Sequence, residues 1–140
     1  MLVEIVTPEA ALWQGSAQAL MARSSDGEFT VLPQHTSLVT DVVPGVVRVA
    51  TSEGEQSFCV HGGYVQVGPG EEPGTTRTTL LAGVAERVSE IDGAQAQADK
   101  ERLEAELAQL GRDGGEDPVA RSVLETELAR AELRLRAIGR

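Results

Sequence analysis

The sequence predicts two domains, an all-β N-terminal sandwich over residues 1–88 followed by a C-terminal antiparallel α-helical hairpin over residues 89–140. The first part holds about eight short apolar segments separated by glycine and proline turns, which is typical of a β-sandwich. The second part carries leucines at helical spacing. It also holds 12 acidic and 8 basic residues, against 10 and 4 in the longer first part. Such dense mixed charge is typical of solvated helices.

The composition excludes several classes of protein. The chain has 140 residues, 41% of them hydrophobic and 24% charged, as in a folded globular protein. Its net charge of -10 disfavours nucleic acid as a partner. No apolar run approaches the ~20 residues that cross a bilayer, so no direct membrane insertion is expected. The N-terminus lacks the basic start of a secretion signal, and the single Cys59 excludes an intrachain disulfide, which suits a reducing cytoplasm.

The β segments begin with an apolar strand over residues 2–6, which Thr7-Pro8 ends. We expect Trp13 to cap one end of the core. Residues 17–24 follow and lead to the polar turn 24–27. The stretch 26–49 contains several short segments, and Pro33 interrupts the first of them because proline cannot donate to a strand ladder. We expect its polar residues to form a loop surface that faces partners; they are His35, Thr36, Ser37, Thr40 and Asp41.

The remaining strands follow in pairs. Residues 45–50 and 56–60 flank Glu53-Gly54, which is a hairpin signal. A Gly62-Gly63 turn precedes the segment 64–67. A polar loop over residues 69–74 then leads to a last strand over residues 75–82.

The first domain shows no catalytic pattern. Its two histidines, His35 and His61, have no second cysteine at zinc-site spacing, and there is no phosphate-binding loop or nucleophile motif. We therefore expect no catalytic residue and no metal site, and we interpret the protein as a non-enzyme.

The first helix is expected to begin at Ser89, with Asp92 completing a short capping box. Leu103, Leu107 and Leu110 then lie on one face. Gly111 and Gly114-Gly115 are expected to end this helix and form the turn.

Asp117-Pro118 is expected to start the second helix, with Asp117 as the cap. Its apolar positions alternate by four and three residues, which predicts one narrow stripe; they are Leu124, Leu128, Ala131, Leu135 and Ile138. A short turn makes the two helices antiparallel. Alanines are expected to keep the helix axes close, namely Ala94, Ala98, Ala105 and Ala131. Helices of this length are marginal alone, so we expect the hairpin to depend on docking and to be able to undock.

One stretch also resembles a known family signature, G-E-x-x-x-L-P-x-H-x-x-L-x-T-x-x-x-P-G-x-x-R-[IV]. The matching positions are Gly27, Glu28, Leu32, Pro33, His35, Leu38, Thr40, Pro44, Gly45, Arg48 and Val49. The chain thereby resembles the epsilon subunit of bacterial F-type ATP synthases. It departs from that family at His61, where serine is usual, and at Gln66, where glutamate is common.

This resemblance implies a non-catalytic central-stalk subunit of a proton-driven synthase. The sandwich would dock on the gamma subunit and the c-ring, and the hairpin would reach the alpha and beta catalytic subunits and inhibit ATP hydrolysis. Five basic residues of the second helix would meet acidic surface there: Arg121, Arg130, Arg134, Arg136 and Arg140. The subunit would lie peripherally on the cytoplasmic face of the cell membrane.

The resemblance also implies a regulatory ATP site, although no cofactor is required. Its residues would be Glu86, Asp92, Arg102, Arg130 and Arg134. In I-D-x-x-R-A, the motif that nucleotide-binding relatives carry at the first helix start, Gln95 replaces the arginine, which removes a charge. Alternatively, Arg130 and Arg134 only pair with nearby acids, and Asp92 is only a helix cap. The alternative function is a free-standing ATP-binding sensor or adaptor with a coiled-coil tail.

Overall fold

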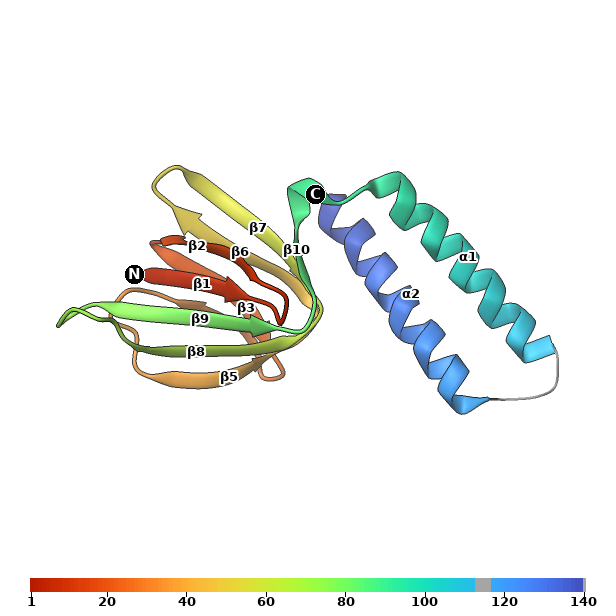
Figure 1. Ribbon diagram of the computed structural model, residues 1–140, viewed down its shortest axis with the longest axis horizontal. Coiled ribbons are helices and arrows are strands. Elements are labelled where there is room, and N and C mark those ends of the chain that lie inside the picture. The colour runs from red at the N-terminus through yellow and green to blue at the C-terminus, as the bar shows by residue number, and fades with distance from the viewer. Residues whose placement is uncertain (113–116, 140) are drawn as a thin grey trace. The chain divides into compact units, whose positions relative to one another are not determined.

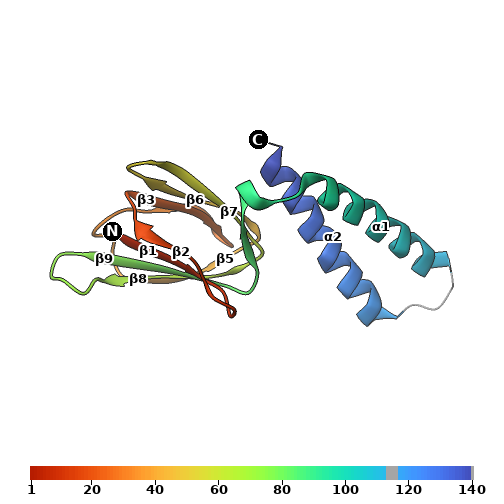
Figure 2. The ribbon, with the colours of Figure 1, turned by 45° about the horizontal axis from the view of Figure 1, so that its top comes forward.

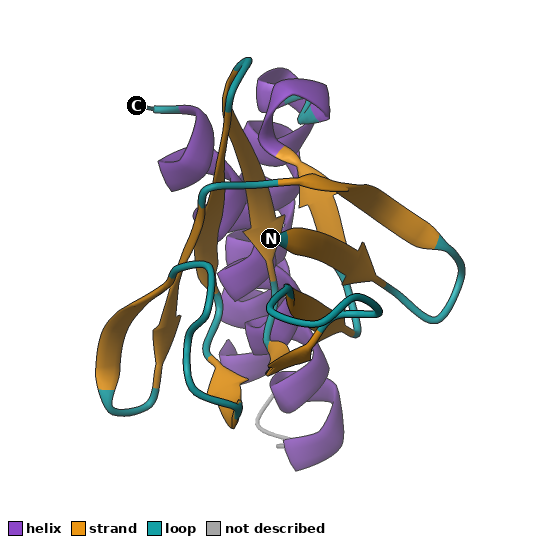
Figure 3. Ribbon diagram, turned by 90° about the vertical axis from the view of Figure 1, so that its left-hand side faces the viewer, coloured by secondary structure: helices purple, strands orange, loops and turns teal. Residues whose placement is uncertain are grey.

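The computed structural model describes residues 1–112 and 117–139, and within them the chain forms ten strands, a short 3-10 turn and two α-helices (Figure 1). Contacts divide the chain into two units, Met1–Val88 and Ser89–Arg140. All described strands belong to the first unit and both described helices to the second. Figure 3 colours the strands and the helices separately. The predicted fold class, a β-sandwich followed by a helical hairpin, is confirmed.

The first sheet has the strand order β2-β1-β9-β8-β5. Its strands are β1 (Leu2–Val6), β2 (Ala11–Ser16), β5 (Leu38–Val42), β8 (Gly63–Pro69) and β9 (Thr76–Ala82). The β1–β9 pair is parallel, whereas the other pairs of this sheet are antiparallel. The N-terminal strand is thereby paired with a strand more than seventy positions away, Leu2 opposite Arg77, which sequence periodicity does not predict.

The second sheet has the order β10-β7-β6-β3-β4 and is antiparallel throughout. Its strands are β3 (Ala19–Ser24), β4 (Gly27–Val31), β6 (Gly45–Thr51), β7 (Gly54–Val60) and β10 (Ala85–Arg87). The predicted hairpin at Glu53-Gly54 is present as the β6–β7 turn, in which Gly54 has φ 126°. This left-handed conformation favours glycine because a Cβ atom is strained there.

The sandwich core lies between the two sheets, which Figures 1 and 2 show as two layers. It is built mainly from valine, leucine, isoleucine and alanine, as the low aromatic content requires. Phe58 is its largest fully buried side chain. The ring of Trp13 packs at the edge of this core, 6.2 Å from that of Phe58 and tilted by 57°. The predicted capping role of Trp13 is confirmed.

The stretch 26–49 joins the two sheets. It runs through β4 of the second sheet, β5 of the first and β6 of the second again. Strand β4 ends at Val31, just before Pro33, and residues 33–37 form an exposed connection. Asp41, which was expected on the loop surface, lies on β5 and has a structural role. Its carboxylate accepts hydrogen bonds from the backbone N–H and the hydroxyl of Ser25.

Gly63 marks a close approach of two strands. A Cβ atom at this position would lie 2.2 Å from the backbone oxygen of Leu81, the residue that precedes the pairing partner of Gly63, Ala82, on β9. Only glycine fits such a contact without moving the backbone. Gly63 is therefore required by the packing of β8 against β9.

The second unit contains helices α1 (Gly93–Arg112) and α2 (Pro118–Ile138), which run antiparallel (Figure 2). The expected start at Ser89 is wrong, because Val88–Glu90 forms the 3-10 turn and α1 begins after Asp92. The expected end at Gly111 is also wrong, since the helix includes it. Gly114-Gly115 lies outside the described residues.

The cap of α2 agrees with the sequence. The side chain of Asp117 accepts hydrogen bonds from the backbone N–H groups of Val119 and Ala120, at 3.0 and 3.3 Å. Pro118 is the first residue of the helix, where its missing N–H costs nothing.

The buried face of the hairpin agrees with the predicted stripe in part, since Ala131 is buried and Leu124, Leu128 and Leu135 are half-buried. In α1 the buried residues are Ala96 and Leu103, whereas the three alanines expected to bring the axes together are exposed; these are Ala94, Ala98 and Ala105. In α2 the buried residues are Ala131, Leu133 and Ala137, and Ile138 is 38% exposed. The buried surface of α2 is therefore broader than a coiled-coil seam. No helix of the described chain is long and apolar enough to cross a membrane.

Candidate functional site

A small polar cavity lies between α1 and α2. Its volume is about 250 Å³, and it is lined by Asp99, Arg102, Leu103, Glu127, Arg130, Ala131 and Arg134. Three of the five predicted nucleotide-binding residues thus meet here, one from α1 and two from α2. Three guanidinium groups face two carboxylates, so the lining carries a net charge of 3 − 2 = +1. The protein is strongly acidic, and this cavity is a local exception that favours an anion.

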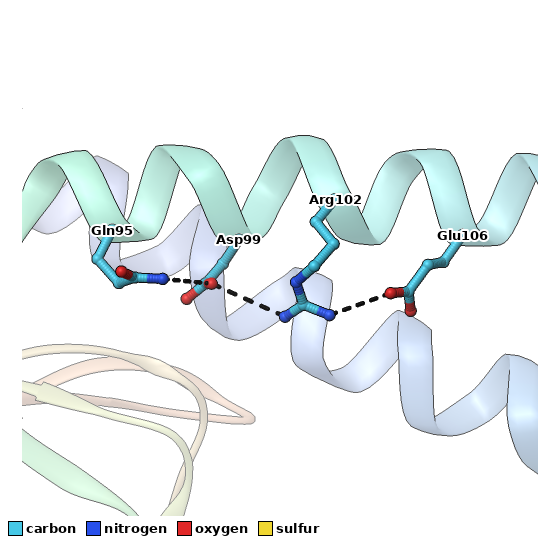
Figure 4. Close-up of polar contacts among 4 residues, drawn as sticks. All are labelled: Gln95, Asp99, Arg102 and Glu106. Atoms are coloured by element: carbon cyan, nitrogen blue, oxygen red, sulfur yellow. Dashed lines mark hydrogen bonds and ion pairs between the residues drawn. The ribbon is translucent and has the colours of Figure 1, made fainter.

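Helical spacing places the two α2 arginines. Arg130 and Arg134 are four residues apart, so their side chains leave the same face of α2 one turn from each other. On α1, Arg102 is held between two acids. Its Nη1 lies 3.2 Å from Glu106 Oε1 and its Nη2 lies 3.7 Å from Asp99 Oδ1 (Figure 4). Because the Arg102 side chain is 55% exposed, these pairs are weak and do not prevent it from contacting a ligand.

Gln95 extends this row of contacts along α1. Its side-chain Nε2 donates to Asp99 Oδ1 at 2.9 Å, so Gln95, Asp99, Arg102 and Glu106 form one continuous polar row (Figure 4). The amide orients Asp99 but adds no positive charge. An arginine here would lie on the same helix face as Arg102, seven residues away.

Asp92 caps α1. Its carboxylate accepts a hydrogen bond from the backbone N–H of Gln95 at 3.1 Å, and its carbonyl accepts from that of Ala96 at 3.0 Å. It is not among the residues that line the cavity. Asp92 was interpreted either as a nucleotide-binding residue or as a helix cap, and the structure shows the helix cap.

Glu86 belongs to the sandwich unit. It lies on β10, and its carboxylate is 3.8 Å from Nε2 of His61. The same nitrogen is 3.7 Å from the sulfur of Cys59. The sequence did not predict this cluster of Cys59, His61 and Glu86. The available signal was the spacing of Cys59 and His61, because side chains two positions apart in an extended chain leave the same face. Glu86 joins them only through the β7–β10 pairing.

The outer face of the first sheet carries an exposed apolar patch. We define the outer apolar patch as Val39, Tyr64 and Leu81, whose side chains are 70%, 60% and 48% exposed. Tyr64 and Leu81 are directly opposite each other on β8 and β9, and Val39 is on the neighbouring β5. All three point away from the core, because the adjacent residues of each strand face inward. Neighbouring exposed apolar side chains of this kind mark interaction surfaces.

Comparisons with known proteins agree over nearly the whole chain. A family model described as "ATP synthase, Delta/Epsilon chain, beta-sandwich domain" matches residues 1–88. The chain is 34% identical over 135 residues to the ATP synthase epsilon chain of Hydrogenovibrio crunogenus, covering 96% of this chain and 81% of the relative. It is 39% identical over 141 residues to that of Nitrosococcus oceani, covering 100% and 93%.

Solved structures show the same fold. One chain of the Euglena gracilis mitochondrial ATP synthase, in a structure described as OSCP/F1/c-ring, matches with a TM-score of 0.76 at 21% identity. The alignment covers 100% of this chain and 81% of that one. At this identity the likeness establishes the fold alone.

Proposed function

The chain belongs to the ATP synthase delta/epsilon chain family, as an epsilon subunit of the central stalk, and we propose that it joins the gamma subunit to the c-ring and restrains ATP hydrolysis. The sandwich is the docking part and the hairpin the regulatory part, meeting the alpha and beta subunits. The subunit itself performs no catalysis. As part of the complex it lies at the cytoplasmic face of the cell membrane.

The outer apolar patch carries the docking proposal. Its apolar side chains are exposed to water, which does not stabilise a free-standing domain. They lie on a sheet whose opposite face forms the core. We assign the gamma subunit as the occupant because a stalk protein needs a lasting, largely apolar contact with the rotating shaft. The exposed connection at residues 33–37 of the sandwich is assigned to the c-ring.

Replacing Tyr64 and Leu81 of the patch by glutamate is expected to weaken binding to a complex depleted of this subunit by roughly ten- to hundredfold. The two substitutions remove apolar contacts and place charge in a desolvated surface, and ten- to hundredfold corresponds to a combined cost of about 1.4–2.7 kcal/mol. The measurement is the dissociation constant for rebinding to the depleted complex.

A matched control is Leu32→Glu, since Leu32 is a similarly exposed apolar residue, 53% accessible, of the same unit outside the patch. Because Leu32 adjoins the connection assigned to the c-ring, this control is measured against the isolated gamma subunit, which it should bind nearly as wild type does. Equal binding by the double variant and wild type would exclude this face as the docking surface.

The hairpin has the properties of a movable element. Few of its side chains are buried within the described residues, and its two helices are of lengths that are marginal in isolation. A weakly held element of this kind can shift between two positions when a ligand or partner favours one. On α2 the cations that would meet the catalytic subunits are Arg121, Arg130, Arg134 and Arg136; Arg140 lies outside the described residues.

We further propose that ATP binds weakly at the α1–α2 cavity. Three arginines offer planar donor groups to a phosphate chain, the geometry that guanidinium groups recognise best. The cavity is smaller than the ~300–1,000 Å³ of usual small-molecule pockets, so it fits the phosphates rather than the whole nucleotide. Within the helical unit Asp92 does not line it, which leaves the arginines as the main contacts of that unit.

Arg134→Ala is expected to abolish the heat of ATP binding in a calorimetric titration of the full chain. Gln95→Arg is expected to tighten binding by about tenfold, because it adds a guanidinium to the face that carries Arg102, and an added charge-assisted hydrogen bond at an exposed site contributes ~1.4 kcal/mol.

Arg121→Ala serves as the control, because Arg121 pairs with Glu125 and is not among the cavity residues. It should leave the titration unchanged. If Arg134→Ala titrates like wild type, the arginine cavity is not the nucleotide site.

A further inference from the structure

The end of strand β7 brings three metal-binding side chains together in the sandwich unit. The sulfur of Cys59, Nε2 of His61 and a carboxylate oxygen of Glu86 all lie within 4.8 Å of one another. We propose that these residues form a zinc site, completed by water, which ties the edge strand β10 to β7. This proposal is independent of the docking and nucleotide proposals.

Backbone pairing builds the site. Cys59 and Glu86 are directly opposite each other in the β7–β10 ladder, so their side chains leave the same face of the sheet. His61 is two residues beyond Cys59 and shares that face. Its backbone N–H donates to the carbonyl of Val84 at 3.0 Å, which holds it beside the start of β10. The donor atoms are therefore positioned by the sheet itself.

The separations suit a tetrahedral ion. Zinc bonds of about 2.0–2.3 Å at tetrahedral angles place donor atoms roughly 3.3–3.6 Å apart. The sulfur and Nε2 are 3.7 Å apart, and Nε2 and the nearest Glu86 oxygen are 3.8 Å apart. The second distance is too long for a hydrogen bond, whose heavy atoms lie within about 3.2 Å. A contraction of a few tenths of an ångström would bring these two separations to zinc distances. The third, between the Cys59 sulfur and the Glu86 carboxylate, lies within 4.8 Å and would close by rotation of the partly exposed Glu86 side chain.

Burial and chemistry favour zinc over magnesium or calcium. Cys59 is fully buried, the His61 side chain is 4% exposed and that of Glu86 is 29% exposed. Thiolate and imidazole are ligands of zinc, whereas magnesium and calcium take oxygen donors. Glu86 leaves an open side from which ion and water can enter. Binding replaces the S–H bond of Cys59 by a metal–sulfur bond, and the proton passes to the solvent.

The site gives the short strand β10 a second attachment. This strand has only three residues and lies at the edge of its sheet, where β7 is its one partner among the described strands. It is also the last strand before the helical unit begins at Ser89. An ion bridging Glu86 to Cys59 and His61 would fix the point at which the chain leaves the sandwich.

Titration of the metal-free full chain with Co²⁺, a spectroscopic substitute for zinc, tests the proposal. We expect one ion per chain with thiolate-to-cobalt charge-transfer absorption, which Zn²⁺ then displaces. His61→Ser should lower the affinity at least a hundredfold and Glu86→Gln about tenfold. His35→Ala is the matched control, since His35 is exposed and remote from the cluster in the sheet pairing, and it should bind as wild type does.

A second measurement does not depend on the spectrum. Zinc at a hundredfold excess over its dissociation constant should raise the melting temperature of the sandwich by roughly 10 °C, monitored by the fluorescence of Trp13, the single tryptophan. The shift should vanish in His61→Ser, whose fold is checked by circular dichroism. Absence of thiolate-to-cobalt absorption would overturn the site. So would a zinc-dependent melting shift that survives in His61→Ser and disappears in His35→Ala.

Discussion

A chain ended after Val88 is expected to assemble normally and to raise ATP hydrolysis by the complex about tenfold. Every residue of the sandwich core lies before this point, and so do both sheets, so the docking part remains whole. The helical unit, which we propose as the inhibitory element, is removed completely. A tenfold rise is expected if the inhibited state of the complex is favoured over the active state by ~1.4 kcal/mol and is lost with the hairpin. The measurement is the hydrolysis rate per assembled complex.

Two observations make this experiment decisive. Stoichiometric recovery of the truncated subunit with gamma shows that docking survives, so a faster rate reports the missing hairpin and not a missing subunit. Unchanged hydrolysis at full occupancy would mean that the hairpin does not inhibit in this enzyme.

Phe58→Ala is expected to lower the unfolding free energy of the sandwich by about 3–5 kcal/mol. Phe58 is fully buried, is the largest such side chain and packs against the ring of Trp13. Removing it leaves a cavity between two sheets whose paired backbones cannot collapse to fill it. Since domains of this size are stable by only ~5–15 kcal/mol, the variant should be partly unfolded at moderate denaturant concentration.

Denaturant unfolding followed by Trp13 fluorescence gives this value for the sandwich, because the tryptophan lies in that unit. Val39→Ala is the control, as Val39 is 70% exposed, and it should change stability by no more than about 0.5 kcal/mol. A loss below 1 kcal/mol for Phe58→Ala would contradict the assigned core.

Several turns and element ends were predictable because their chemistry is local. Pro33 ends β4, Gly54 takes the left-handed conformation of the β6–β7 hairpin, and Asp117 with Pro118 starts α2. Each depends on a backbone property of one or two residues. The start of α1 was misplaced because Ser89 and Asp92 are both good caps, and only the observed 3-10 turn distinguishes them.

The helical faces were predicted less well for a different reason. A heptad pattern assumes one narrow partner. It included Ile138, whose Cδ1 lies 2.7 Å from where a Cβ atom on Gly93 of α1 would stand, but it did not include the buried Leu133. The alanines of α1 are good helix formers wherever they lie, so their presence does not show which of them faces α2. Among the candidate site residues, the spacing of Arg130 and Arg134 predicted that both leave the same face of α2, because that spacing is local. That Arg102 lines the same cavity follows only from the packing of the two helices.

The sequence alone determined the family, the two kinds of secondary structure and the point near residue 88 at which one replaces the other. These depend on short-range periodicity, turn residues and a motif of contiguous positions. The tertiary structure decided which distant residues meet: the outer apolar patch across β5, β8 and β9, the arginine cavity between α1 and α2, and Glu86 beside Cys59 and His61. Strand order and register fix these contacts, and both arise from long-range pairing that no local pattern encodes.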